Sequence, residues 1–506
     1  MNFWKIALVA LLAGGSQLAL ATEYTDRLIL KLRAPTASAQ MHTIMSANQA
    51  STLSQVAGVQ LAAVRAMSGG GQVLRLPQTV TVAEAQAVAD KLQSDPGVEY
   101  AEPDHIRRPA LVPNDTSYGS QWNLHSAYGI QAPAAWDITT GSLGAVVAVL
   151  DTGITAHAEL VGRTLSGYDF ISDVFIANDG DLRDADPSDP GDWVTAGEIL
   201  AHTPPCSGGA ANSSWHGTAI AGLIGAISNN SAGVAGINWT SKILPVRVMG
   251  KCGGYVSDIV DGMRWAAGLS VSGVPSNSNP AKVLNLSLGS TGACSTTEQN
   301  AINEIVALNK VVVAAAGNDS SDVASSAPAS CSGVIAVAAT TRSGSHTSIS
   351  NTGSLVAISA PGGESNDGIY MLANTGTTAP VSDTYGGYYG TSVAAAGVSG
   401  VVSLMFSVNS QLSPAQVKSI LQSTAIAFPD LTCTTTTCGA GIVNAAAAVS
   451  LASTTIGIPY VAPSSSGGGG GGGGCATGTK LVPDPLLVFM AGAALAGLFW
   501  RRITRL

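Results

Sequence analysis

The stretch "AVVAVLDTG" (residues 145–153) has the pattern of a strand that is buried on both faces, because its apolar run is unbroken up to Asp151. Continuous apolar strands are typical of parallel sheets that helices cover on both sides. Similar runs follow in "KILPVRVMG" (242–250), "KVLNLSLGS" (282–290), "KVVVAAAGN" (310–318) and "GVIAVAAT" (333–340). We therefore predict an α/β fold with a parallel sheet flanked by helices.

Polar side chains stand where these runs end. Asp151, Ser287 and Asn318 each follow an apolar run. In open parallel sheets, binding and catalytic sites gather at the carboxyl ends of the strands. We therefore expect these three side chains to lie near one site.

Two further stretches read as the beginnings of apolar helices. "SSWHGTAIAGLIGA" (213–226) places His216 at a helix start, and "YGTSVAAAGVSGVVSLM" (389–405) does the same for Ser392. Taken singly, His216 fits a buried core histidine and Ser392 fits a helix N-cap. Asp151 in "DTG" fits a turn, or an aspartic protease, which would need a second copy that the sequence lacks.

Taken together, the three residues supply an acid, a base and a nucleophile in the order Asp, His, Ser, which is one of the known triad orders. A serine hydroxyl attacks a carbonyl only when a base removes its proton, and a neutral histidine can take and return that proton. A carboxylate orients the histidine. The amide of Asn318 and a backbone N–H at the Ser392 helix start can donate hydrogen bonds to an oxyanion.

These stretches resemble the subtilisin-like serine proteases over roughly residues 115–450. The resemblance implies a serine endopeptidase that forms an acyl-enzyme on polypeptide substrates. It also implies a substrate-binding strand in "NLSLGS" (285–290) and the base of the S1 pocket in "SAPAS" (326–330). The substrate-binding residues that it implies are Ser287, Leu288, Gly289 and Ser326. The sequence departs from the family after the nucleophile, where Val393, Ala396 and Gly397 replace the usual methionine, proline and histidine.

Residues 22–112 read as a small α+β unit and resemble the inhibitory prodomain of the same family. The resemblance implies that this segment assists folding, inhibits the enzyme and is removed autocatalytically somewhere around residues 108–117. The peptidase domain is then expected at 113–455.

The first 21 residues have a basic start, an apolar run and an Ala-Leu-Ala cleavage pattern, which indicates a secretory signal peptide and not a membrane anchor. A Gly/Ser-rich linker (456–480) precedes an apolar segment with a basic end (481–506). This end resembles a C-terminal sorting signal, which implies at least transient membrane insertion, an enzyme that is secreted or associated with the cell envelope, and a sorting protease as a partner. A buried core helix is the alternative.

Because the signal peptide predicts export, we expect the cysteines of this chain to form disulfides. The sequence contains seven, and pairing in chain order gives 206–252, 294–331 and 433–438, although sequence alone leaves other pairings open. The members of these pairs are Cys206, Cys252, Cys294, Cys331, Cys433 and Cys438. Cys475 remains either unpaired or modified. Metal binding by these cysteines is disfavoured, because the spacing lacks a CxxC motif.

Calcium is the expected metal. "ISNNSAGVAG" (227–236) resembles the calcium loop of the family, which implies Asn230, Glu159 and Gln121 as ligands. A second candidate is "DGDLRDADPSDPGDW" (179–193), whose six aspartates would repel one another without a cation. From it we select Asp184, Asp189 and Asp192. A solvated acidic surface loop is the alternative.

Composition narrows the function further. The 506 residues are 46% hydrophobic and 11% charged, with a net charge of −9, which argues against nucleic acid as a partner. A non-catalytic binding protein on the same scaffold is the remaining alternative to a secreted endopeptidase.

Overall fold

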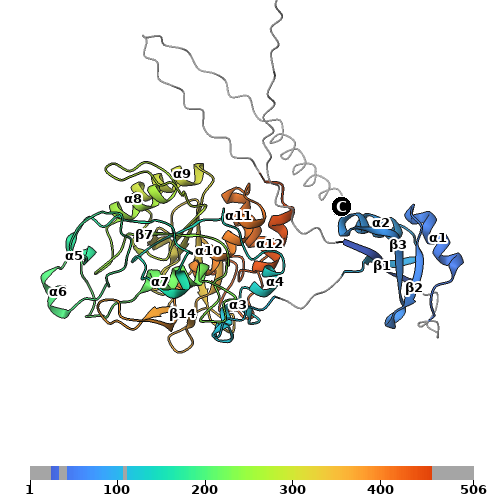
Figure 1. The fold of residues 1–506 in the computed structure, drawn as a ribbon, viewed down its shortest axis with the longest axis horizontal. Coiled ribbons are helices and arrows are strands. Elements are labelled where there is room, and N and C mark those ends of the chain that lie inside the picture. Colours follow the sequence, from blue (N-terminus) through green and yellow to red (C-terminus); the bar gives the residue numbers. More distant parts are fainter. Residues whose placement is uncertain (1–23, 34–42, 106–110, 458–506) are drawn as a thin grey trace, which may run out of the picture. The chain divides into compact units, whose positions relative to one another are not determined.

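The computed structural model describes residues 24–33, 43–105 and 111–457. The expected signal peptide, the apolar C-terminal segment, Cys475 and nearly all of the glycine linker lie outside these residues. The described residues form a small N-terminal unit and a large unit (Figure 1).

The N-terminal unit is a four-stranded antiparallel sheet with two helices. Its strands are β1 (Tyr24–Leu32), β2 (Ala62–Ala66), β3 (Gly71–Thr81) and β4 (Val98–Pro103), in the order β2-β3-β1-β4, with helices α1 (Ala47–Ala57) and α2 (Val82–Gln93). Both helices begin at a capping box, Ser46 with Gln49 and Thr81 with Glu84, which satisfies N–H groups that a helix start leaves free. Leucines and alanines of the sheet and the helices form a core of their own.

The large unit is built on a seven-stranded parallel sheet in the order β13-β12-β10-β8-β5-β7-β6. Its strands are β5 (Val147–Asp151), β6 (Tyr168–Asp169), β7 (Ile243–Arg247), β8 (Val283–Leu286), β10 (Val311–Ala315), β12 (Val334–Thr340) and β13 (Val356–Pro361). The five apolar runs of the sequence are all strands of this sheet, which confirms the predicted α/β fold class.

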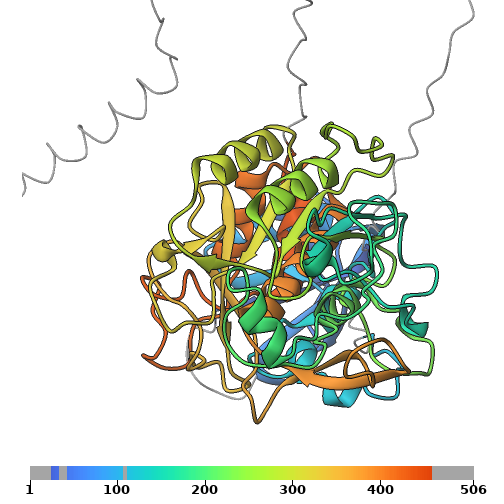
Figure 2. The same ribbon diagram turned by 90° about the vertical axis from the view of Figure 1, so that its left-hand side faces the viewer.

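Helices cover both faces of the sheet. The side chains of β5 alternate between two cores: Val147 and Val149 pack in one, Ala148 and Leu150 in the other. The first core contains α7 (His216–Gly225), α10 (Thr391–Val408), α11 (Pro414–Ser423) and α12 (Ala445–Thr454). The second contains α8 (Val256–Ala266) and α9 (Thr296–Ala307), which lie side by side in Figures 1 and 2.

Short elements complete the large unit. They are α3 (Trp122–His125), α4 (Ala132–Trp136), α5 (Val174–Ala177), α6 (Ala196–Ala201), β9 (Ser290–Thr291), β11 (Ser326–Ala327), β14 (Ile369–Asn374) and β15 (Asp383–Tyr388). Among the described residues, only α10 is long and apolar enough to cross a membrane, and 83% of it is buried inside the fold. We therefore treat α10 as a core helix.

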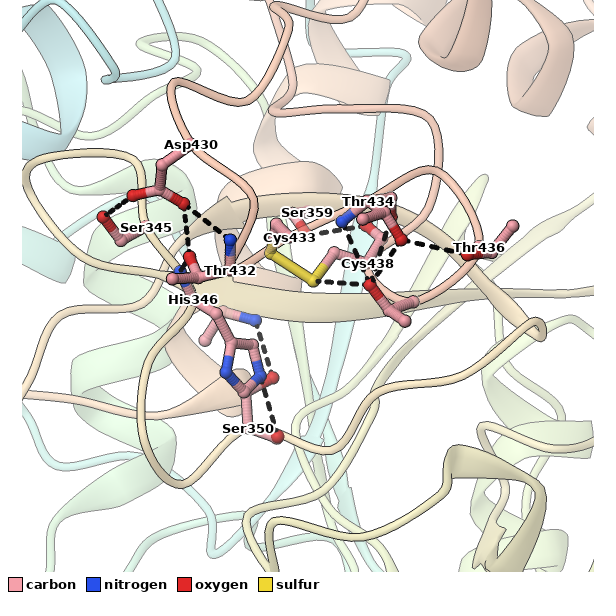
Figure 3. The surroundings of a disulfide bond; sticks show 12 residues. Ser345, His346, Ser350, Ser359, Asp430, Thr432, Cys433, Thr434, Thr436 and Cys438 are labelled. Carbon is pink, nitrogen blue, oxygen red and sulfur yellow. Dashed lines mark hydrogen bonds between the residues drawn. A yellow bond between two sulfur atoms is a disulfide. The ribbon is translucent and has the colours of Figure 1, made fainter.

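Three disulfides join the cysteines in chain order: Cys206–Cys252, Cys294–Cys331 and Cys433–Cys438. Glu298 lies close to Cys294 and Cys331, but those sulfurs are bonded to each other and cannot act as thiolate ligands for a metal. Figure 3 shows the Cys433–Cys438 disulfide, whose two cysteines are buried, and nearby Asp430, which accepts hydrogen bonds from Ser345 and Thr432.

Candidate active site

Asp151 and His216 form a hydrogen-bonded pair at the end of the sheet. Asp151 ends β5 and its side chain is 1% exposed, while His216 is the first residue of α7. The distance between His216 Nδ1 and Asp151 Oδ1 is 2.7 Å, and the Thr152 N–H donates to the same oxygen at 2.8 Å. Burial lowers the pKa of His216, but the carboxylates of Asp151, Asp192 and Asp189 together raise it above the usual value.

The residue before His216 holds an unusual conformation. Trp215 has a φ of 52°, in the left-handed region that bulky residues rarely adopt. Its ring is buried, and its Nε1–H donates to the Gly376 carbonyl at 2.8 Å. Packing and this hydrogen bond therefore hold the chain in the conformation that begins α7 at His216.

Ser392 is the second residue of α10, as the sequence predicts. Its Oγ donates to the Ser287 carbonyl at 2.9 Å, and the Ser287 hydroxyl donates to the Ser392 carbonyl at 2.7 Å. Gly390, before the helix, has a φ of 127°, and a Cβ there would lie 3.2 Å from Asn318 Nδ2. Glycine therefore suits both the backbone turn and the close approach of Asn318.

The orientation of Asn318 is set by the residue before the candidate nucleophile. Asn318 Oδ1 accepts hydrogen bonds from the Thr391 N–H at 2.9 Å and from the Thr391 hydroxyl at 3.0 Å. This leaves the Asn318 Nδ2 hydrogens as the donors that its side chain can offer to a ligand. The sequence did not point to Thr391; only its position beside Ser392 could have suggested a role.

A cleft of about 530 Å³ brings the candidate residues together. His216, Ser392 and Asn318 line it, and so do all four residues expected to bind substrate, namely Ser287, Leu288, Gly289 and Ser326. Its remaining lining includes Asp192, Val194, Ser214, Met249 and Cys252. The cleft therefore combines a nucleophile, a base and an amide donor beside two segments, β9 and β11, that pair as strands.

The first expected calcium site fits a cation only in part. Gln121 is occupied, because its side chain bonds both peptide groups of Ala235. Glu159 accepts hydrogen bonds from Asn230 and Tyr385, each at 3.1 Å. The structure adds Asp115, whose Oδ1 is buried and without a hydrogen-bond partner. Burial raises the pKa of both Asp115 and Glu159, and the charge of Asp115 raises that of Glu159 further. Asp115 and Glu159 suit a cation, whereas Gln121 does not.

The second expected calcium site does not fit. The carboxylates of the three predicted ligands Asp184, Asp189 and Asp192 accept hydrogen bonds from different parts of the chain. Asp184 accepts from the Asp186 N–H, Asp189 from Thr152, and Asp192 from Ser214. Repulsion within the acidic loop persists, because desolvation and the charges of Asp179 and Asp184 raise the pKa of Asp181, while Asp179 itself pairs with Arg247.

The family departures after Ser392 are packing positions. Val393 is 2% exposed and Ala396 is fully buried in the first core. Gly397 is buried, and a Cβ built on it meets no atom within 4 Å. The missing methionine, proline and histidine are thus replaced by small side chains inside the fold.

Comparison with known proteins supports one family. The subtilase family model matches residues 142–455. The chain is 49% identical to the "Extracellular protease" of Xanthomonas campestris, over 78% of this chain and 66% of that protein. It is 41% identical to the "Extracellular basic protease" of Dichelobacter nodosus, over 85% of this chain and 71% of that protein. A solved protease structure from Pseudoalteromonas arctica matches with a TM-score of 0.65 and 49% identity, covering 68% of this chain and 100% of that one.

Proposed function

Because the chain belongs to the subtilase family of serine endopeptidases, we propose that it cuts polypeptides outside the cell with Ser392 as nucleophile, His216 as base and Asp151 as orienting acid. The observation that carries these roles is the 2.7 Å hydrogen bond between His216 and Asp151 beside the cleft that Ser392 and Asn318 line. A base held by a carboxylate next to a serine is the arrangement that activates a hydroxyl.

The reaction begins when the Ser392 hydroxyl turns from the Ser287 carbonyl toward His216 and attacks the substrate carbonyl carbon. His216 takes the hydroxyl proton, and Asp151 stabilises the imidazolium that forms. The tetrahedral oxyanion accepts hydrogen bonds from the Asn318 amide and from the Ser392 N–H, which lies in the first turn of α10. His216 then gives its proton to the leaving amine, and water releases the acyl group from Ser392 by the same steps.

A fluorophosphonate probe tests this proposal directly. Such a probe phosphonylates only a serine that a neighbouring base activates. We expect mature wild-type protein to be labelled on Ser392 and to cleave casein, and Ser392→Ala to do neither. A mature, folded wild-type protein that remains unlabelled would instead support a non-catalytic binding protein on this scaffold.

Residues 22–112 act, in this proposal, as an inhibitory prodomain and folding aid. Their support is the separate core of the N-terminal unit, which allows this segment to fold as a module. The Leu111 and Asn114 N–H groups donate to the side chains of Asp137 and Asn229, so these residues already contact the large unit. Full-length Ser392→Ala should keep its prodomain, and its complete processing without added protease would argue against autocatalytic removal.

Calcium stabilises the large unit in this proposal. Asp115 and Glu159 would hold the ion, with Asn230 beside them, and the ion would neutralise two buried carboxylates. Since carboxylate oxygens are the ligands that calcium prefers, the orphaned Asp115 oxygen supports this role.

The proposal extends to the ends of the chain, which lie outside the described residues. Residues 1–21 direct export, the linker at 456–480 separates the enzyme from its tail, and the 481–506 segment inserts transiently into the membrane until a sorting protease removes it. Intact mass of the released enzyme tests this order of events. A released species that retains residues 481–506 would contradict the sorting role.

A further inference from the structure

Two aspartates of the acidic loop reach the helix that carries His216. Asp189 is 3% exposed, and its Oδ2 accepts a 2.7 Å hydrogen bond from the Thr152 hydroxyl. The Thr152 oxygen in turn accepts from the Gly217 N–H at 3.1 Å. Thr152 follows Asp151 and Gly217 follows His216, so this one hydroxyl ties together the backbones of both members of the pair.

A second path runs parallel to the first. Asp192 accepts from the Ser214 N–H at 2.6 Å and from the Ser214 hydroxyl at 2.7 Å. The Ser214 oxygen then accepts from the His216 N–H at 3.2 Å. Tyr388 fixes the same loop from another side, because its hydroxyl donates to the Ser214 carbonyl at 3.1 Å.

Both paths end on N–H groups that a helix start leaves without a partner in the helix. A carboxylate that accepts from a hydroxyl fixes the direction of that hydroxyl, so the oxygen lone pairs point at the N–H. The start of α7 is therefore held by two chains of hydrogen bonds, each of which runs from a carboxylate through a hydroxyl to a backbone N–H. We call these two chains relays. The backbone of α7 also packs closely at Gly217, since a Cβ there would lie 2.1 Å from the Gly153 carbonyl oxygen.

We propose that Asp189 and Asp192 are positioning residues of the peptidase reaction. Asp189 fixes the backbones beside Asp151 and His216 through the Thr152 hydroxyl, and Asp192 fixes the His216 backbone through the Ser214 hydroxyl. The inference rests on the proposed function and adds to it the residues that hold and tune the base. Asp192 also lines the cleft, so its charge faces the imidazolium that forms during catalysis.

The charges around His216 give this role a second effect. A helix N-terminus disfavours a positive charge on a histidine, and nearby carboxylates favour it. Burial lowers the pKa of His216, while Asp151, Asp192 and Asp189 raise it. Asp319 also lines the cleft. The cations of the large unit beside the acidic loop already have acidic partners, since Arg247 pairs with Asp169 and Asp179, and Lys251 pairs with Glu198. Burial raises the pKa of Tyr388 to about 12, so its hydroxyl stays neutral near neutral pH.

Asp192→Asn removes the negative charge and keeps the side-chain shape. Asparagine can still accept from the Ser214 N–H through Oδ1, but its Nδ2 cannot accept from the Ser214 hydroxyl. The pKa of His216 should fall, so the acid limb of kcat/KM should move to lower pH by a few tenths of a unit. Asp186→Asn is the matched control, because it removes the same charge from the same loop. Among the described residues, the Asp186 carboxylate accepts a hydrogen bond only from the Ser188 N–H.

Thr152 tests the hydroxyl relay independently of charge. Thr152→Val keeps the side-chain shape and removes the donor to Asp189 and the acceptor for Gly217. It should lower kcat per active site about tenfold at little cost in KM, because the base loses its exact position. Thr152→Ser keeps the hydroxyl and should restore kcat. Asp189→Asn should lower kcat in the same way as Thr152→Val.

Active sites are counted by fluorophosphonate titration, and thermal unfolding of each variant reports its fold. An acid limb for Asp192→Asn that coincides with that of Asp186→Asn would overturn the charge effect. Wild-type kcat in folded Thr152→Val would overturn the relay. Carbon-13 histidine NMR on full-length Ser392→Ala measures the His216 pKa in a variant that needs no activity. If the wild-type enzyme does not react with the fluorophosphonate probe, that result counts against the proposed function and not against the relays.

Discussion

Ser287 and Ser392 exchange hydrogen bonds: the hydroxyl of each donates to the carbonyl oxygen of the other, at 2.7 and 2.9 Å. The bond from Ser287 ties the end of β8 to the start of α10, and Asn285 donates to the Ser287 hydroxyl at 2.9 Å. The candidate nucleophile therefore rests on the strand that is expected to bind substrate.

Ser287→Ala should lower kcat several-fold and cost about 1 kcal/mol of stability, because the Ser392 carbonyl and Asn285 each lose a buried partner. Steady-state kinetics and chemical denaturation measure the two effects. Ser290→Ala is a suitable control, since Ser290 lines the same cleft but is exposed. Equal kinetics for the two variants would mean that the Ser287 hydroxyl does not position Ser392.

Asn318→Ala should lower kcat about 10²–10³-fold and leave KM nearly unchanged, because the amide acts on the oxyanion and not on the bound substrate. Thr391→Val should have a smaller effect, since the Thr391 N–H still holds Asn318 Oδ1. A large rise in KM for Asn318→Ala would instead assign the amide to substrate binding.

Activity should be lost as the pH falls. Despite burial, which lowers it, the pKa of His216 is raised by Asp151, and a protonated histidine cannot accept the Ser392 proton. The acid limb of kcat/KM should therefore lie above about 6.5, the value for an unperturbed histidine. A profile of kcat/KM against pH measures it. A midpoint below that of free histidine would show that burial outweighs the carboxylates.

Two glycines of α10 should respond in opposite ways to alanine. Gly397→Ala should stabilise the protein by up to about 1 kcal/mol, because alanine favours the helix and its Cβ meets no atom within 4 Å. Gly400→Ala should destabilise it, because the new Cβ would lie 2.8 Å from Ile237 Cβ. The denaturant midpoints of the two variants measure how each alanine changes the stability of the protein. Destabilisation by Gly397→Ala would show that the surrounding helix cannot accept the methyl group.

Removal of calcium should lower the thermal midpoint of the mature enzyme. Chelation would leave the Asp115 and Glu159 carboxylates buried and uncompensated, which disfavours the folded state. Glu159→Gln should reduce the dependence of the midpoint on added calcium. Asp184→Asn should leave that dependence unchanged, since Asp184 caps the Asp186 N–H. Identical midpoints for wild type with calcium and with chelator would rule out a stabilising ion.

The sequence by itself determined the parallel sheet, because unbroken apolar runs such as 145–150 leave a strand no solvent-facing side. It also located Asp151, His216 and Ser392 at element ends, since helix starts and strand ends have local signatures. The cysteines pair in the structure in the chain order that was expected. Each of these features is encoded over a few neighbouring residues or in simple order along the chain.

Only the tertiary structure decided the use of the acidic loop. The six aspartates between 179 and 192 read as a calcium site, yet Asp189 and Asp192 turn to Thr152 and Ser214, which lie 37 and 22 residues away in sequence. The Gln121 side chain likewise forms hydrogen bonds with the N–H and the carbonyl of Ala235. A carboxylate or an amide pairs with whichever donor the fold brings within about 3 Å, and no local pattern encodes that distance. Residue type can therefore suggest a ligand, but packing chooses the partner.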